Sequence, residues 1–329
     1  MTRQPIDDED RLARGTRSRP RSRLRPKHED AATCRVVSVD RGRFGCLVDG
    51  DTRDALVVAM RARELGRRAI AVGDEVDVVG DLGGGPDALA RVVRIAPRRS
   101  VLRRSADDSD PVERVLVANA EQLIVVAASA DPPPQPRLID RCLVAAYDAG
   151  IAPGLCLTKS DLASSDELAA IYRDLDLLIV RSGRPGFDAA VAVLREALAG
   201  KVTVLVGSSG VGKSTLVNAL VPDATQRIGA VSASSGKGQH TTTAAIALPL
   251  PDGGWVIDTP GIRSFGLAHV GRGRLVECFP DIAPGTAECP SDCDHLDPEV
   301  CELDAWIAAG HSSPQRLDSL RRLLLSSDA

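Results

Sequence analysis

Hydrophobic and polar positions follow two different patterns along this chain. Over residues 33–97 the apolar residues come in five short runs separated by Gly and Asp turns. After residue 115 the apolar runs alternate with segments whose apolar residues recur at helical spacing. The first pattern predicts a small all-β domain, and the second predicts an α/β domain. We therefore expect a multidomain protein.

The five short runs predict a β-barrel of the oligonucleotide-binding (OB) type over residues 33–97. They read TCRVVSVD, RFGCLVDG, DALVVAM, AVGDEVDVVG and ALARVVRIAP. Barrels of this type hold single strands with a basic face and stacked aromatic rings, and Phe44 is the one aromatic residue in these runs. A spacer or protein-docking barrel is the alternative. Arginines keep nucleic-acid binding open, namely Arg35, Arg41, Arg43, Arg61, Arg63, Arg67 and Arg68.

Residues 115–277 predict a central α/β domain that follows a charged, turn-rich linker at 98–114. Apolar runs of strand type occupy residues 121–129, 151–157, 176–180 and 202–206. Helical spacing occupies residues 138–149, 167–175 and 191–198. Alternating strands and helices predict a doubly wound, mostly parallel sheet.

A phosphate-binding loop follows the strand at 202–206. Gly207-Ser-Ser-Gly-Val-Gly-Lys-Ser214 matches the spacing GxxxxGK[ST], and apolar residues at helical spacing follow it. Its glycines let backbone N–H groups face a polyphosphate, Lys213 can reach the terminal phosphates, and the Ser214 hydroxyl can bind Mg²⁺. A glycine-rich turn that binds nothing is the alternative. The predicted GTP-binding residues here are Gly207, Ser208, Ser209, Gly210, Val211, Gly212, Lys213, Ser214 and Thr215.

Asp258-Thr-Pro-Gly261 supplies the expected second half of an NTPase site. It ends a short apolar run, so Asp258 can face Mg²⁺ and the Gly261 N–H can contact a γ-phosphate. Residues 234–243, SSGKGQHTTT, have the composition of a switch that orders on Mg²⁺ and γ-phosphate. We expect Ser214, Asp258 and a switch threonine, Thr241 or Thr242, to complete the Mg²⁺ shell.

Thr158-Lys-Ser-Asp161 predicts that the nucleotide base is guanine. A carboxylate can accept hydrogen bonds from both the N1–H and the 2-amino group of guanine, a pattern that adenine lacks. The segment is similar to the [NT]KxD motif of GTPases, with Thr158 where Asn is usual; the loss of one hydrogen bond would cost about 1 kcal/mol. The predicted base-site residues are Thr158, Lys159, Ser160 and Asp161, with backbone contacts from Ser182 and Gly183.

The C-terminal region, residues 278–329, holds three thiols and one imidazole within thirteen residues. Such soft ligands suit tetrahedral Zn²⁺, which can fold a segment that has little core of its own. Four unligated residues in a loop are the alternative. We expect helices at 304–309 and 314–325, whose Arg316, Arg321 and Arg322 face either RNA or solvent, and we expect Cys278 to be a packed residue. The predicted ligands are Cys289, Cys293, His295 and Cys301.

Charge and composition add a predicted disordered basic arm at residues 1–32. The 329-residue chain has a formal charge of −4, yet residues 11–27 carry eight Arg or Lys and no acid. The arm is either an electrostatic contact to nucleic acid or a solvated tail. No apolar run reaches the ~18 residues that a membrane span requires, so we expect no membrane partner. Scattered cysteines among the eight fit a reducing cytoplasm.

The order of the motifs is informative. Most GTPases place [NT]KxD last, but here TKSD precedes the phosphate loop, so the domain looks circularly permuted. Together with the barrel, GKGQHTTT (236–243), DTPGIRSF (258–265) and the Cys/His tail, the chain over residues 33–320 resembles the RsgA family of GTPases. The resemblance implies Mg²⁺-dependent GTP hydrolysis in a late step of small ribosomal subunit maturation. It further implies turnover stimulated by the subunit, GTP, GDP and rRNA as binding partners, and a cytoplasmic monomer.

Ile262 follows DTPG where many GTPases place the Gln that orients the attacking water. We therefore expect slow intrinsic turnover, with Lys213 holding phosphates and His240 as the polar residue that positions water. One rival is a P-loop ATPase or small-molecule kinase, which TKSD and DTPG disfavour. Another is a nucleic-acid-binding assembly module whose hydrolysis is incidental.

Overall fold

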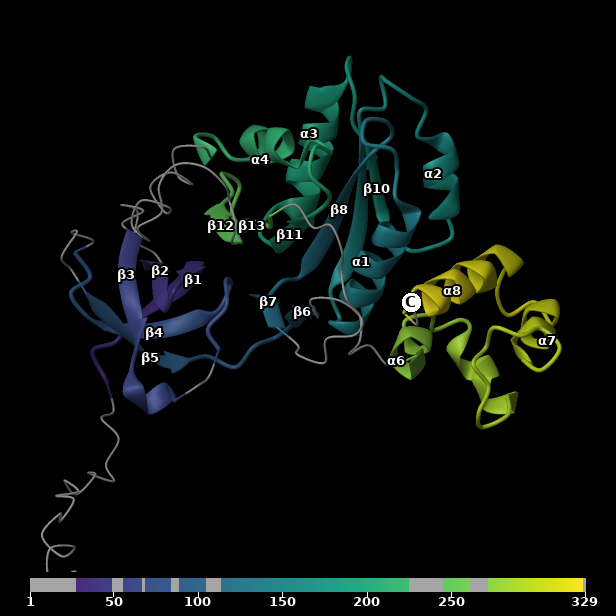
Figure 1. Ribbon diagram of the computed structural model, residues 1–329, viewed down its shortest axis with the longest axis horizontal. Coiled ribbons are helices and arrows are strands. Elements are labelled where there is room, and N and C mark those ends of the chain that lie inside the picture. Colours follow the sequence, from purple (N-terminus) through teal and green to yellow (C-terminus); the bar gives the residue numbers. More distant parts are fainter. Residues whose placement is uncertain are drawn as a thin grey trace, which may run out of the picture. The chain divides into compact units, whose positions relative to one another are not determined.

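The computed structural model describes residues 28–48, 56–66, 69–83, 89–104, 114–224, 245–260 and 272–327 (Figure 1). The predicted basic arm lies almost wholly outside these residues, as does the predicted switch at 234–243. From Ala31 onward the chain forms one compact unit.

The N-terminal part is the predicted five-stranded barrel. Neighbouring strands pair in the order β1-β2-β3-β5-β4, and β4 pairs with β1 to close the barrel. All pairs are antiparallel except β3–β5, which is parallel. Alternate residues of each strand fill a small core that contains Val36, Cys46, Val57 and Val92. The strands are β1 (Ala32–Asp40), β2 (Arg43–Val48), β3 (Leu56–Arg61), β4 (Glu75–Gly80) and β5 (Ala90–Ile95), with a short 3₁₀ helix, η2 (Arg63–Leu65).

Part of the predicted linker at 98–114 is a strand. β6 (Val101–Arg104) pairs antiparallel with β7 (Arg114–Ala118), and Leu102 and Val117 are fully buried between them and the neighbouring core. Four arginines, at 98, 99, 103 and 104, and the acidic run after them make the segment polar on average, which hides the inward-facing Leu102. Residues on both sides of 105–113, which lie outside the described residues, therefore belong to one two-stranded sheet.

The central domain is the predicted doubly wound sheet. Its strands lie in the order β10-β9-β8-β11-β13-β12, and all pair in parallel except β12, which is antiparallel to β13. β12 also pairs with β1 at Ser38–Ile246, so the barrel and the central sheet are joined at this edge. The strands are β8 (Gln122–Ala128), β9 (Ala152–Thr158), β10 (Leu178–Arg181), β11 (Val202–Val206), β12 (Ile246–Pro249) and β13 (Trp255–Asp258).

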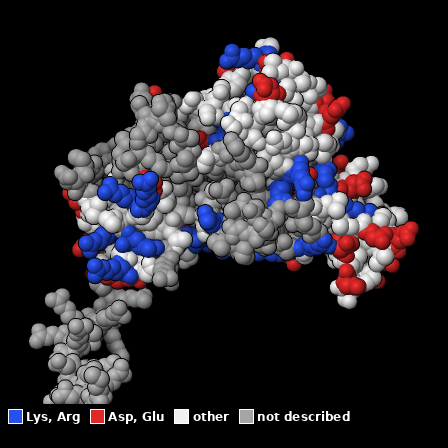
Figure 2. Space-filling model, viewed as in Figure 1, with Lys and Arg blue, Asp and Glu red and all other residues white. Residues whose placement is uncertain are grey.

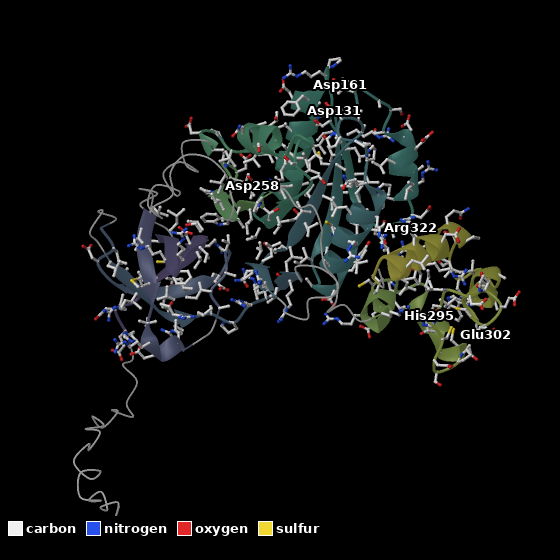
Figure 3. All side chains as sticks on the ribbon, in the orientation of Figure 1. Asp131, Asp161, Asp258, His295, Glu302 and Arg322 are labelled. Carbon is white, nitrogen blue, oxygen red and sulfur yellow. The ribbon has the colours of Figure 1, made fainter. Side chains whose placement is uncertain are left out.

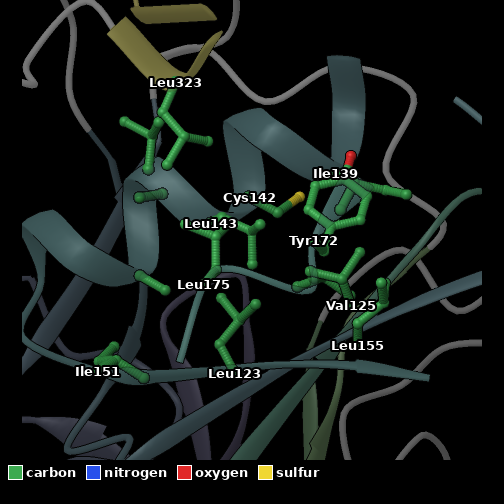
Figure 4. Packing of buried hydrophobic residues seen from close by; sticks show 14 of the residues in the cluster. Leu123, Val125, Ile139, Cys142, Leu143, Ile151, Leu155, Tyr172, Leu175 and Leu323 are labelled. Carbon is green, nitrogen blue, oxygen red and sulfur yellow. The ribbon is translucent and has the colours of Figure 1, made fainter. Parts of the chain in front are cut away.

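Helices cover both faces of this sheet. On one face, α1 (Pro136–Asp148) and α2 (Asp166–Ile171) pack over strand residues such as Leu123 and Leu155 (Figure 4). On the other face, α3 (Phe187–Leu198) and α4 (Lys213–Leu220) form a second core. Both faces of the parallel strands are thus buried, which explains why their sequences are continuously apolar rather than alternating.

The C-terminal module consists of α6 (Arg272–Glu277), the 3₁₀ helix η3 (Ala283–Glu288), α7 (Leu303–Ala308) and α8 (Pro314–Ser327). Leu320, Leu323 and Leu324 of α8 pack into the same core as α1 (Figure 4). The module therefore shares its core with the central domain.

Three arginines of α8 form ion pairs with carboxylates of the chain itself. We had expected these arginines to face either RNA or solvent. Arg316 pairs with Asp281 and Asp176, and Arg322 pairs with the buried Asp140 at 3.2 Å. Arg321 forms an ion pair with Asp304. Since Asp140 and Asp176 belong to the central domain, two of these arginines dock the tail.

Among the described residues, each helix is too short or too polar to cross a lipid bilayer.

Candidate nucleotide site and metal centre

The predicted phosphate loop joins the central strand β11 to helix α4. All five residues of β11 are buried, and Lys213 is the first residue of α4. Gly210 and Gly212 have φ angles of +83° and +91°, which residues other than Gly rarely adopt. A Cβ atom at Gly207 would lie 2.4 Å from the Val126 carbonyl oxygen. The glycines are thus required by backbone geometry, and the loop amides lie at a helix N-terminus that favours anions.

Lys213 and Asp258 meet in a buried ion pair. β13 runs parallel to β11 with Asp258 opposite Leu205, which brings the strand end beside the loop. The Lys213 ammonium donates to Asp258 Oδ1, and each side chain is 9% exposed. Thr259 is fully buried and donates to the Leu205 carbonyl at 2.8 Å. The two NTPase signatures therefore converge at one edge of the sheet.

The TKSD segment lies beside the same loop. Thr158 ends β9, two strands away from β11, and is 7% exposed. Its hydroxyl donates to the Val211 carbonyl of the phosphate loop at 2.5 Å, although 53 positions separate the two residues. The fold thus brings together two motifs that the sequence places far apart.

Ser182 and Gly183 lie against the end of the TKSD segment. The Ser160 N–H donates to the Ser182 carbonyl at 3.1 Å. A Cβ atom at Gly183 would lie 2.9 Å from Asp161 Oδ1, so only Gly allows this close approach. Asp161 itself is exposed at the end of the sheet (Figure 3). Its carboxylate is accessible to a ligand, as base recognition requires.

The loop after β8 is a part of the site that the sequence analysis missed. The Lys159 ammonium donates to the Asp131 carbonyl, so this loop contacts the TKSD segment (Asp131 and Asp161 are labelled in Figure 3). The Ser208 hydroxyl contacts Gln135 Oε1 at 3.5 Å. The prolines 132–134 line an apolar hollow together with Val211 of the phosphate loop. The position of this loop at the carboxyl end of a central parallel strand is the signal that would have found it.

The remaining predicted residues divide into two groups. Ser209, Ser214 and Thr215 are exposed at the rim of the phosphate loop. Gly261, His240, Thr241 and Thr242 lie outside the described residues, so their predicted roles stay predictions.

The four predicted zinc ligands form one cluster. The ligand atoms of Cys289, Cys293, His295 and Cys301 all lie within 4.8 Å of one another (His295 is labelled in Figure 3). Cys301 Sγ lies 3.9 Å from Cys289 Sγ and 3.7 Å from His295 Nδ1. A tetrahedral zinc site with Zn–S bonds of about 2.3 Å has S–S edges of about 3.8 Å. The cluster could therefore hold a metal ion of this size.

Burial and neighbouring sulfur atoms disfavour a thiolate at Cys301 when no cation is bound. Burial raises the pKa of the Cys301 thiol to about 12, and the neighbouring Cys289 and Cys293 add to the shift. A bound cation would remove this penalty, because it stabilises thiolates. Arg321 supports the site from α8 by donating to the His295 carbonyl at 3.0 Å. Cys278 is half-buried and outside the cluster, as expected.

Comparisons with known proteins agree with this geometry. A family model described as RsgA GTPase matches residues 95–268. The chain is 36% identical to the small ribosomal subunit biogenesis GTPase RsgA of Gemmatimonas aurantiaca over 265 residues, covering 78% of this chain and 84% of the relative. It is 39% identical to the protein of the same name from Pseudomonas aeruginosa over 291 residues, covering 86% and 83%.

Solved structures show the same architecture. The crystal structure of YjeQ from Thermotoga maritima superimposes with a TM-score of 0.63 at 25% identity, covering 91% of this chain and 99% of that chain. YloQ, described as a circularly permuted GTPase, gives a TM-score of 0.63 at 21% identity and covers 93% of this chain and 98% of its own. Both the family model and the full-length relatives lead to one conclusion: this chain belongs to the RsgA GTPase family, and its central domain is a circularly permuted GTPase domain.

Proposed function

We propose that this GTPase assists a late step in maturation of the small ribosomal subunit, and that the subunit stimulates its GTP turnover. The observation that carries the nucleotide part is the hydrogen bond from Thr158 to Val211, which sets the TKSD segment against the phosphate loop. The names of the relatives, small ribosomal subunit biogenesis GTPase, support the biological part.

The loop amides and Lys213 hold the phosphates of GTP, and Asp161 accepts hydrogen bonds from the guanine edge. Because Lys213 now pairs with Asp258, arriving phosphates replace Asp258 as the partner of the ammonium. Asp258 is then free to face Mg²⁺ together with Ser214 and a switch threonine, Thr241 or Thr242. Mg²⁺, when bound, neutralises charge that develops on the phosphates. His240 stays a prediction as the residue that positions water.

Zn²⁺ is the proposed metal of the Cys/His cluster, where it has a structural role. Three thiols and one imidazole match its preferred ligands, and the two separations from Cys301, 3.9 Å to Cys289 and 3.7 Å to His295, are close to the edges of a tetrahedral site. The neighbouring α8 docks on the central domain through Arg316 and Arg322, so a folded tail also supports the GTPase domain.

The RNA of the subunit is the proposed partner of the barrel. Lys and Arg gather on the barrel surface in Figure 2, and phosphate contacts from such side chains give binding that depends on salt. We expect the chain to act as a monomer in the cytoplasm, a reducing compartment that suits eight cysteines of which none forms a disulfide.

GTP turnover with and without purified small subunits tests the proposal. We expect slow intrinsic hydrolysis and a rise of at least tenfold with subunits. Unchanged turnover together with nucleotide-independent binding would favour the rival, an assembly module whose hydrolysis is incidental.

Asp161→Asn tests base selection. An amide presents a donor where the carboxylate presents an acceptor, so GTP affinity should fall at least tenfold while affinity for xanthosine triphosphate rises. Glu167→Gln, an exposed acid on the nearby α2, is the matched control and should bind GTP normally. Equal uptake of ATP and GTP by the unmodified chain would instead favour the P-loop ATPase or kinase.

A further inference from the structure

The hydroxyl of Thr158 has two hydrogen-bond partners, and both belong to the backbone. It lies 2.5 Å from the Val211 carbonyl oxygen of the phosphate loop and 3.3 Å from the Ala127 carbonyl oxygen of β8. The residue is 7% exposed, and its own carbonyl accepts from the Ser129 N–H at 2.8 Å. A Cβ atom at Gly212 would lie 3.8 Å from Thr158 Cβ, so a side chain at this loop position would contact Thr158.

A hydroxyl carries one hydrogen, and this decides what Thr158 can offer a nucleotide. Carbonyl oxygens only accept, so the single hydrogen is used by Val211 or Ala127, and the Thr158 oxygen can then only accept. Guanine N7 and O6 are themselves acceptors. Thr158 therefore has no donor left for either atom. An asparagine at this position would carry two N–H hydrogens, one for the loop carbonyl and one for the base.

We propose that Thr158 is a positioning residue, which fixes the phosphate loop against β9 and takes no part in base recognition. Guanine selection then rests on the Watson–Crick edge, through Asp161, and nucleotide affinity does not depend on N7. This inference rests on the proposed binding of GTP at this site. It concerns how the base is read, which the TKSD pattern alone leaves open.

Calorimetry with GDP and 7-deaza-GDP on the unmodified full-length chain tests the inference without any substitution. The analogue replaces N7 by C–H and leaves the Watson–Crick edge and the phosphates intact. We expect the two dissociation constants to agree within about twofold. A preference of fivefold or more for GDP, which is about the value of one hydrogen bond, would overturn the inference.

Two substitutions separate the loop contact from base contact. Thr158→Asn should create a preference of about fivefold for GDP over 7-deaza-GDP, because it adds a second donor. Thr158→Val keeps the shape of the side chain but removes the hydroxyl. It should lower the affinities for GDP and 7-deaza-GDP by the same factor, about three- to tenfold. Thr158→Ser restores the hydroxyl and should recover most of that loss. If Thr158→Val lowered the affinity for GDP but not the affinity for 7-deaza-GDP, the result would contradict the assignment.

Thr203→Val is the matched control. Thr203 is a fully buried strand threonine whose hydroxyl contacts Gln122 at 3.1 Å and does not reach the loop. The Thr203→Val substitution should leave the affinities for GDP and 7-deaza-GDP unchanged. If the unmodified chain binds neither guanine nucleotide, the proposed function itself fails. If it binds both but depends on N7, only the role of Thr158 fails.

Discussion

At the scale of single residues, the site is decided by two long-range contacts. Lys213 is paired with Asp258 before any nucleotide arrives, and Thr158 holds the Val211 carbonyl. A buried ion pair is weak evidence for stability, but the loss of one partner leaves an uncompensated buried charge. The ammonium of Lys213, which the phosphates of a nucleotide would contact, thus pairs with Asp258 in this structure.

Asp258→Ala should lower the free energy of unfolding of the nucleotide-free chain by about 3–5 kcal/mol, because it leaves the Lys213 ammonium buried without its partner. GDP should restore part of this loss, since its phosphates can pair with Lys213. Thermal and denaturant unfolding with and without GDP measure both effects. Asp252→Ala, at an exposed turn before β13, is the control and should change stability by less than about 0.5 kcal/mol. Equal effects of the two substitutions would contradict the prediction.

At the scale of elements, the C-terminal module combines the Cys/His cluster that could hold a metal ion with the long helix α8. η3 and α7 are one or two turns long, and the loop between them carries the four ligands. Such a segment buries little apolar surface by itself, so we expect the proposed metal ion to supply much of its folding free energy. α8 in turn packs on α1 through its core leucines and through the ion pair of Arg322 with Asp140.

Cys301→Ser or a strong chelator should unfold the module and lower the thermal midpoint of the whole chain. Cys278→Ser is the control, because this thiol lies outside the cluster. Metal affinity should rise with pH, since burial raises the pKa of Cys301 to about 12 and the thiol must lose its proton to bind. Metal titrations at pH 6, 7 and 8 measure this dependence. A module that keeps its hydrogen-exchange protection after complete metal removal would show that its core suffices.

At the scale of the molecule, the C-terminal module is distinguished by its excess of acidic residues. Figure 2 shows Lys and Arg on the barrel and Asp and Glu on the C-terminal module. Nine acidic residues and no Lys or Arg lie between Arg274 and Arg316. In the barrel, Arg63 and Arg91 flank a hollow that also contains the exposed Met60 and Leu89. Contacts to RNA phosphates should therefore come from the barrel rather than from the metal module.

Arg63→Glu combined with Arg91→Glu should reduce stimulation of GTP turnover by small subunits and leave basal turnover unchanged. Each lost phosphate contact should lower the slope of log affinity against log salt by about one. Turnover and subunit binding at two salt concentrations measure both quantities. Arg173→Glu, an exposed arginine on the central domain, is the charge-matched control. A salt slope that does not change would assign the RNA contact to another surface.

Short-range sequence patterns were sufficient to predict many of the structural elements of this protein. The phosphate loop depends on local backbone geometry, so the glycines at 207, 210 and 212 predicted it directly. The metal ligands lie within thirteen residues of one another, and their spacing was enough to group them. Apolar runs likewise predicted the doubly wound sheet, because burial on both faces leaves a continuous signal, and short runs separated by turn residues predicted the barrel.

The sequence by itself thus determined which motifs exist and in which permuted order they occur. The tertiary structure decided which of them meet. The Thr158–Val211 contact, the Lys213–Asp258 pair and the docking of Arg316 and Arg322 join residues 45 to 182 positions apart. Such contacts follow from strand order and helix packing, for which local periodicity carries no information. The polar composition of β6 likewise predicted a linker, and only its pairing with β7 shows that this segment is a strand.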